Sequence, residues 1–275
     1  MPRSIKPVRL NHMNFVLESA GESIGRFKEL YGAYLLADMP QKEMHAYLID
    51  IGRVIFEGFV PNEYLLNARY GPHYVGVEYQ ADIDEVRAAL QDHSIRTVRD
   101  IGIALHTHPE DCFGVAFEFY DGYFHDREWE LFDGRAMKPA EYWRDEHPLG
   151  ITGMKGYTLA AFDIHAATRF LRSFLSGVPV YEEARDAISG RAVGLQVADA
   201  VVEVISPDGP GILLDHMHRY GEGIRSTVFG VGSIDQARDY FAQHGVEIEP
   251  GSMPQSIQVP APDNCGVLFE FVEDI

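Results

Sequence analysis

The apolar positions of the chain follow one pattern four times. An apolar strand comes first, then an amphipathic helix with apolar residues every three or four positions, then further alternating strands. In the first and third copies the helix ends near a glycine and the last strand ends at a proline, both frequent stop signals. These two copies read LNHMNFVLESAGESIGRFKELYG at 10–32 with HAYLIDIGRVIFEGFVP at 45–61, and GYTLAAFDIHAATRFLRSFLSG at 156–177 with GRAVGLQVADAVVEVISP at 190–207.

The second and fourth copies match each other in the same way. HYVGVEYQADIDEVRAALQDHSI at 73–95 corresponds to STVFGVGSIDQARDYFAQHGV at 226–246, and both copies end on a strand centred on glutamate, DCFGVAFEFYD and NCGVLFEFVED. Ser23 and Asp163 lie near the starts of the first and third helices as candidate caps. The pattern predicts an α+β protein of four βαβββ units, at roughly 8–61, 72–123, 154–207 and 223–273.

Two modules follow from this repeat. We expect a first module at 1–123, a connecting segment at 124–153 and a second module at 154–275. The connecting segment fits neither half and is rich in charges, but it also carries large aromatic residues. Those aromatics predict that the segment docks onto the protein: Phe124, Trp129, Tyr142 and Trp143.

Composition narrows the functional classes. Acidic residues outnumber basic ones by 42 to 23, for a formal charge of −19, which repels nucleic acid and anionic membranes. Only Cys112 and Cys265 are present, too few for a disulfide framework, and the N-terminus lacks the apolar core of a signal peptide. We therefore expect a soluble, cytoplasmic protein with a small-molecule ligand, no nucleic-acid partner and no membrane span.

Two short motifs point to other chemistries without supporting them. GESIG at 21–25 matches the GxSxG nucleophile pattern, but the repeat makes Ser23 a helix cap outside any hydrolase-type sheet. GVGS at 230–233 precedes a helix without the full dinucleotide fingerprint. We expect neither a serine hydrolase nor a nucleotide cofactor.

The unit order and the glutamate-centred final strands, with Glu118 in VAFEFY and Glu270 in LFEFVE, resemble the vicinal oxygen chelate superfamily. That superfamily includes glyoxalase I, methylmalonyl-CoA epimerase, extradiol dioxygenases and fosfomycin or bleomycin resistance proteins. The resemblance covers nearly the whole chain and implies two modules with cupped mixed sheets. It also implies a divalent metal in the cup, with ligands from the first and last strands of each unit.

Residues of the first module stand at those family positions. The resemblance implies His12, Glu57, His73 and Glu118 as metal ligands, at spacings of 45, 16 and 45 residues. Imidazole and carboxylate suit Zn, Ni, Co, Mn or Fe(II). The second module has Gly156 and either Ile224 or Ser226 at the histidine positions, so we expect no comparable metal there.

Several alternatives stay open for these ligands. His73 is two residues from the usual family position, nearer Val75, so His106 and His108 are its substitutes. Glu57 and Glu118 are mirrored by Glu203 and Glu270 in the module without histidines, which leaves a structural role open for these glutamates. Some family members also pair units across modules; we expect pairing within the first module because it unites all four candidate ligands.

Three functions follow. The resemblance first implies a metal-dependent lyase, isomerase or epimerase that acts on vicinal substrate oxygens through an enediolate, with Glu118 or Glu57 as the base. The second is an Fe(II) extradiol-type dioxygenase using His12, His73 and Glu118, although such enzymes usually carry their metal in the second module. The third is a metal-free binding protein lined by aromatic residues. A homodimer is left open.

Overall fold

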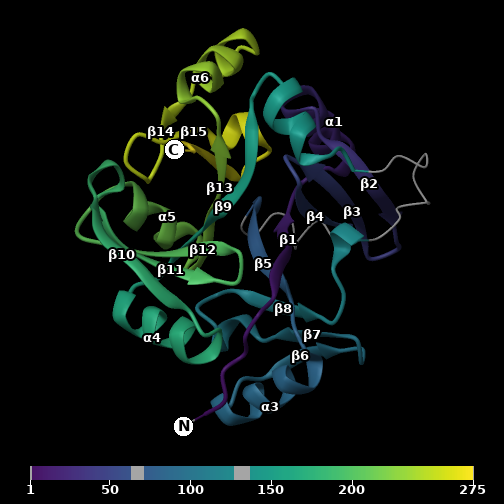
Figure 1. Ribbon diagram of the computed structural model, residues 1–275, viewed down its shortest axis with the longest axis vertical. Coiled ribbons are helices and arrows are strands. Elements are labelled where there is room, and N and C mark those ends of the chain that lie inside the picture. Colours follow the sequence, from purple (N-terminus) through teal and green to yellow (C-terminus); the bar gives the residue numbers. More distant parts are fainter. Residues whose placement is uncertain (1, 63–70, 127–136, 275) are drawn as a thin grey trace. The chain divides into compact units, whose positions relative to one another are not determined.

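Two eight-stranded sheets form the structure, a computed structural model that describes residues 2–62, 71–126 and 137–274 (Figure 1). The first sheet has the strand order β2-β3-β4-β1-β5-β8-β7-β6, and the second has β10-β11-β12-β9-β13-β16-β15-β14. The two orders are the same because the sequence repeat is the same. Strand β1 lies beside β5, and β9 beside β13, so each sheet contains strands of two consecutive βαβββ units.

The elements follow the predicted order in both halves. The first half contains β1 (Arg9–Val16), α1 (Ala20–Tyr31), β2 (Tyr34–Pro40), β3 (Met44–Ile51), β4 (Val54–Pro61), β5 (His73–Gln80), α3 (Ile83–His93), β6 (Thr97–Asp100), β7 (Ala104–Thr107) and β8 (Ala116–Tyr120). The second contains β9 (Ile151–Ala160), α4 (Ile164–Phe174), β10 (Val178–Arg185), β11 (Gly190–Val197), β12 (Ala200–Pro207), α5 (Ile212–Tyr220), β13 (Gly223–Val231), α6 (Ile234–Gln243), β14 (Glu249–Pro250), β15 (Ile257–Val259) and β16 (Leu268–Glu273). Helix α5, between the third and fourth units, was not predicted.

The helix caps show how local sequence sets the helix starts. Asp163 caps α4 as predicted, because its side chain accepts a hydrogen bond from the backbone N–H of Ala166. The prediction for Ser23 is wrong: Ser19 is the N-cap of α1, and Ser23 lies one turn inside the helix. There the buried Ser23 hydroxyl donates a hydrogen bond to the carbonyl oxygen of Ser19, four residues earlier, at 2.6 Å.

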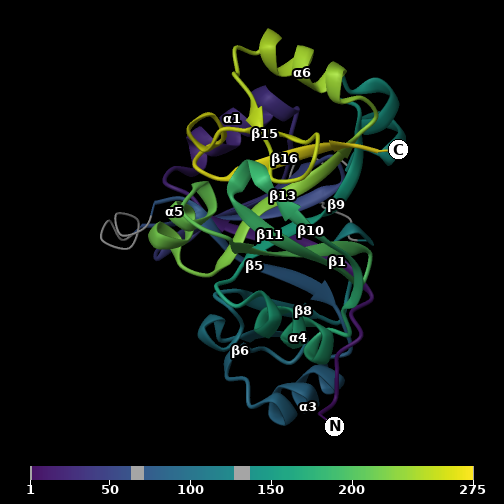
Figure 2. The ribbon, with the colours of Figure 1, turned by 90° about the vertical axis from the view of Figure 1, so that its left-hand side faces the viewer.

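The chain divides into two compact units, called unit 1 and unit 2, which differ from the four βαβββ units of the sequence repeat. Unit 1 comprises Met1–His12, Val75–Asp126 and Gly156–Arg225, and unit 2 comprises Met13–Tyr74, Arg127–Lys155 and Ser226–Ile275. In unit 1, α3 packs on β8, and α4 packs on β11 and β12. In unit 2, α1 packs on β3 and β4, and α6 packs on β16 (Figure 2).

Aromatic side chains build the core of each unit. In unit 1, Phe117 and Phe119 of β8 meet Phe174 of α4 at ring-centroid distances of 6.4 and 6.1 Å. In unit 2, Phe56 and Phe269 meet at 5.0 Å. All of these rings are fully buried, which removes a large apolar area from water in both units.

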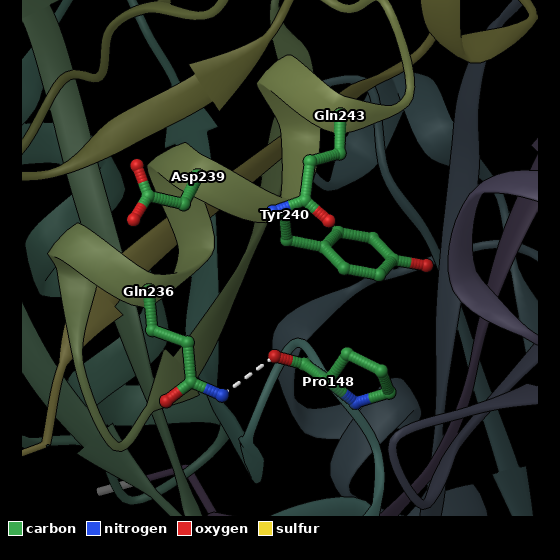
Figure 3. A pocket seen from close by; sticks show the side chains of 5 residues that line it. All are labelled: Pro148, Gln236, Asp239, Tyr240 and Gln243. Atoms are coloured by element: carbon green, nitrogen blue, oxygen red, sulfur yellow. Dashed lines mark hydrogen bonds between the residues drawn. The ribbon is translucent and has the colours of Figure 1, made fainter.

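The connecting segment is docked where the structure describes it. Trp143 is completely buried in unit 2, with its ring 6.1 Å from Tyr34 and 5.0 Å from His147. On the surface of α6, the side-chain amide of Gln236 donates to the carbonyl oxygen of Pro148 at 2.7 Å, beside a shallow hollow (Figure 3). Trp143 therefore docks as predicted, and Trp129 lies outside the described residues.

Two further sequence expectations concern cysteines and membranes. Cys112 and Cys265 are both free thiols. Among the described helices, none has the length and apolar character needed to cross a lipid bilayer.

Candidate metal centre

Three strands of the first sheet bring one histidine and two glutamates together in unit 1. His12 lies on β1, Glu78 on β5 and Glu118 on β8. Strands β5 and β8 are parallel, and Glu78 and Glu118 are direct register partners, so their side chains leave the same face of the sheet. Because β1 is the other neighbour of β5, His12 completes the group. One donor atom from each residue lies within 4.8 Å of the others.

The group is almost closed to solvent. The exposed fractions are 1% for His12, 4% for Glu78 and 8% for Glu118. His12 Nδ1 lies 3.4 Å from Glu78 Oε1, and His12 Nε2 lies 3.8 Å from Glu118 Oε2. Two carboxylates buried in one group repel each other and lose hydration when both are ionised, and positive charge between them would offset this cost. A protonated imidazole or a bound cation supplies that charge.

The donor set fits a divalent transition metal. One imidazole nitrogen and two carboxylate oxygens are suitable ligands for Zn, Mn, Fe(II), Co or Ni. Bonds of about 2.1 Å place neighbouring donors about 3.0–3.4 Å apart. One donor atom from each residue lies within 4.8 Å of the others, and an ion binds only one nitrogen of His12, so the three side chains would draw together around it. Among the described residues, this is the one group of three or more such side chains that meets this geometry.

An aromatic ring covers the imidazole. Phe124 stacks on His12 with ring centroids 4.9 Å apart and an interplanar angle of 22°. Asn11, the neighbour of His12 on β1, holds the segment that carries this ring. Its side chain donates to the carbonyl oxygen of Gly122 at 3.1 Å and accepts from the Phe124 N–H at 2.9 Å. The stacked ring limits rotation of His12 and excludes water from one face of the group.

Of the four predicted ligands, the group contains His12 and Glu118. Strand geometry argues against His73, because it is five residues from Glu78 on β5 and alternation directs the two side chains to opposite faces. Its Nδ1 lies 2.8 Å from the carbonyl oxygen of Gly71 instead. The group of three thus takes its β5 donor from Glu78, and the ligand role of His73 stays a prediction.

The other candidates do not belong to the group of three. Glu57 is half-buried on β4 in unit 2, opposite Leu48 of β3, and its ligand and base roles stay predictions. His108 caps a short 3₁₀ helix, where its Nδ1 accepts from the Glu110 N–H. His106, on β7, contacts Glu118 without belonging to the group of three.

Sequence reasoning missed Glu78. The signal available was a glutamate inside the apolar run HYVGVEYQ, the same kind of signal that identified Glu118. The family resemblance implied a histidine on this strand and so pointed to His73. The pairing of Glu78 with Glu118 depends on the register of β5 against β8. That register is a property of the assembled sheet.

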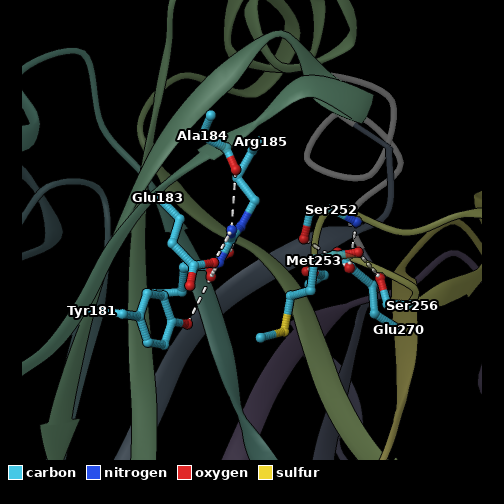
Figure 4. A network of polar contacts seen from close by, with 10 residues as sticks. Tyr181, Glu183, Ala184, Arg185, Ser252, Met253, Ser256 and Glu270 are labelled. Carbon is cyan, nitrogen blue, oxygen red and sulfur yellow. Dashed lines mark hydrogen bonds and ion pairs between the residues drawn. The ribbon is translucent and has the colours of Figure 1, made fainter.

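The mirrored glutamates Glu203 and Glu270 of the second sheet have protein partners, and Figure 4 labels Arg185 and Tyr181 of the first network and Glu270 with Ser252 of the second. In unit 1, Glu203 of β12 pairs with the buried guanidinium of Arg185 and accepts from the Tyr181 hydroxyl at 2.7 Å. In unit 2, Glu270 of β16 accepts from the Ser226 hydroxyl and from both the N–H and the hydroxyl of Ser252, each at 2.7 Å. These two glutamates have the structural role that the sequence repeat left open.

Solved structures share this architecture over the whole chain. A triple variant of 4-hydroxymandelate synthase from Streptomyces coelicolor matches with a TM-score of 0.73 and 13% identity, over 99% of this chain and 93% of that one. A variant of homoprotocatechuate 2,3-dioxygenase from Brevibacterium fuscum matches with a TM-score of 0.65 and 13% identity, over 98% and 72%. The chain has the vicinal oxygen chelate fold.

A third match to this fold is a xylose isomerase-like TIM barrel/4-hydroxyphenylpyruvate dioxygenase fusion protein. Its TM-score is 0.67 at 12% identity, over 99% of this chain and 49% of that one. The sequence matches no protein-family model and no curated protein. At such low identities the vicinal oxygen chelate assignment describes the fold, and chemistry has to be argued from the site itself.

Proposed function

We propose that this protein is a cytoplasmic metal-dependent enzyme that moves a carbon-bound proton on a small substrate with adjacent oxygen atoms, as a lyase, isomerase or epimerase. The buried group of His12, Glu78 and Glu118 carries the proposal. It combines donors that suit a divalent ion with a carboxylate that can accept a proton, within one cluster. The vicinal oxygen chelate fold supports this assignment as an analogy only.

Each residue has a distinct part in this proposal. His12, Glu78 and Glu118 would hold the ion, which when bound would polarise the substrate oxygens and favour negative charge on them. Glu118 is the proton acceptor, because its side chain is 10% exposed against 5% for Glu78, and an entering substrate reaches it more easily. Phe124 keeps water from the His12 side of the cluster.

The second candidate is an Fe(II)-dependent dioxygenase. Two structural neighbours carry dioxygenase in their names. Two histidines also flank Glu118, with His106 Nδ1 at 3.1 Å from Oε1 and His12 Nε2 at 3.8 Å from Oε2, and these are the residue types of a two-histidine, one-carboxylate triad. We rank it second because the group of mutually close donors contains one histidine and two carboxylates.

Metal titration tests the proposal. Metal-free protein is titrated with Co(II), Zn and Mn, and with Fe(II) without oxygen, beside His12→Ala, Glu78→Gln and Glu57→Gln; exposed Glu110→Gln is the control. We expect one ion per wild-type chain, an affinity reduced by more than about 100-fold in His12→Ala and Glu78→Gln, and an unchanged affinity in Glu110→Gln. A reduced affinity in Glu57→Gln would support the predicted ligand role of Glu57. A wild-type chain that binds none of these ions would refute both enzyme proposals and favour the metal-free binding protein.

Turnover then separates the two enzymes. The proton-transfer enzyme exchanges a substrate C–H with deuterated solvent in the absence of oxygen, whereas the dioxygenase consumes oxygen with Fe(II) and a catechol. Glu118→Gln should lose exchange while keeping part of its metal affinity, because the amide oxygen can still bind an ion but the amide cannot accept the proton.

A further inference from the structure

We propose that His106 is a positioning residue that fixes the orientation of the Glu118 carboxylate, so that one oxygen is held away from the ion and the other is presented to it. This inference rests on the proposed metal site. It concerns a side chain outside the group of three donors, on a different strand from all of them.

The sheet register places His106 beside Glu118. Strands β7 and β8 are antiparallel, and the two residues are direct cross-strand partners, so their side chains project from the same face as neighbours. His106 Nδ1 lies 3.1 Å from Glu118 Oε1. Glu118 Oε2 is the oxygen that faces His12, 3.8 Å from its Nε2. The two oxygens of one carboxylate are thus directed to two different imidazoles.

The contact has a defined polarity. An ionised carboxylate only accepts hydrogen bonds, so with Glu118 ionised a hydrogen bond between the two would run from His106 Nδ1–H to Oε1. Such a hydrogen bond to Oε1 would restrict rotation of the carboxylate and leave Oε2 as the oxygen that would hold the ion. Outer partners of this kind change metal affinity by about 10- to 100-fold when they are removed.

The side chains of His106 and His12 also differ in solvent exposure. The His106 side chain is 23% exposed, whereas that of His12 is 1% exposed. His106 therefore stands at the solvent side of Glu118, and His12 at its buried side. This placement suits a residue that orients a ligand from outside the cluster.

Substitution of His106 tests the inference through the bound metal. His106→Leu removes the donor at similar volume, and His106→Asn places an amide N–H₂ close to the former Nδ1. His108→Leu is the matched control, since that neighbouring histidine contacts Glu110. The measurements are Co(II) affinity and the visible spectrum of the bound Co(II), with thermal unfolding as the check on folding. We expect Leu to weaken binding by about 10- to 100-fold and shift the spectrum, and Asn to restore most of both.

The outcomes are distinguishable from failure of the metal site. Wild-type protein that binds no Co(II) refutes the proposed function itself. Wild-type binding with an unchanged His106→Leu affinity and spectrum refutes the positioning role and leaves the three-donor site standing. Complete loss of binding in both His106→Leu and His106→Asn would make His106 a direct ligand and also overturn the inference. Should His106→Leu fail to fold, His106→Ala against His106→Asn makes the same comparison.

Discussion

Replacing Asp50 by asparagine should stabilise the protein in a strongly pH-dependent way. Asp50 lies on β3 in unit 2 and is completely buried. Burial raises the pKa of its carboxyl from 3.8 to about 7, and the charge of Arg53 opposes this rise only in part. Between these two values the folded protein keeps Asp50 protonated while the unfolded chain has already lost the proton.

The sign and size follow from the two pKa values. Below pH 3.8 the carboxyl is protonated in both states and costs no stability. As the pH rises from 3.8 to about 7, the unfolded state gains by ionisation, and above about 7 the difference stays constant. This rise of the pKa from 3.8 to about 7 corresponds to about 4 kcal/mol of unfolding free energy. Asparagine does not titrate, so the advantage of Asp50→Asn should grow by up to this amount between pH 4 and pH 8.

Urea denaturation followed by tryptophan fluorescence measures this difference. Wild type and Asp50→Asn are unfolded at half-unit steps from pH 4 to pH 8, and the difference in unfolding free energy is plotted against pH. Other titrating groups cancel because both proteins carry them. Asp208→Asn is the control, since its side chain is exposed, and its difference from wild type should be flat. A flat plot for Asp50→Asn as well would refute the burial argument.

Three further substitutions test other parts of the structure. Gly76→Ala should destabilise the protein by about 1–3 kcal/mol and weaken metal binding, because the added Cβ would lie 2.3 Å from a carbonyl oxygen of β8; denaturation and Co(II) titration check both. Arg185→Met should cost about 3–5 kcal/mol in urea denaturation, because it leaves the Glu203 carboxylate buried without its cation. Asn11→Ala should lower the thermal midpoint and speed Co(II) exchange in stopped-flow measurements, because two hydrogen bonds that hold the Phe124 segment are lost.

The fold could be predicted from the sequence because its determinants are local and repeated. Hydrophobic periodicity distinguishes strands from helices within each stretch, and four copies of one pattern leave few ways to assemble them. Even so, the cap of α1 was misplaced from Ser19 to Ser23, because both serines stand near the helix start and only backbone geometry separates them. Helix α5 was missed because it lies between the third and fourth βαβββ units, in a stretch to which the repeat assigned no element.

The candidate site was predicted in part. His12 and Glu118 could be recognised because each is a polar residue in an apolar strand at a repeated position, and burial of such a residue demands a partner. Glu203 and Glu270 carry the same local signal, yet Arg185 and two serines are their partners. The sequence by itself thus determined which strands carry buried charge.

Tertiary structure decided which charges meet. Strand register set Glu78 opposite Glu118 and His106 beside it, while alternation along β5 directs His73 away from Glu78. A shift of one residue in any of these pairings would exchange the buried and exposed faces. Register depends on hydrogen bonds between strands that are distant in the chain, so the choice among candidate partners belongs to the assembled sheet.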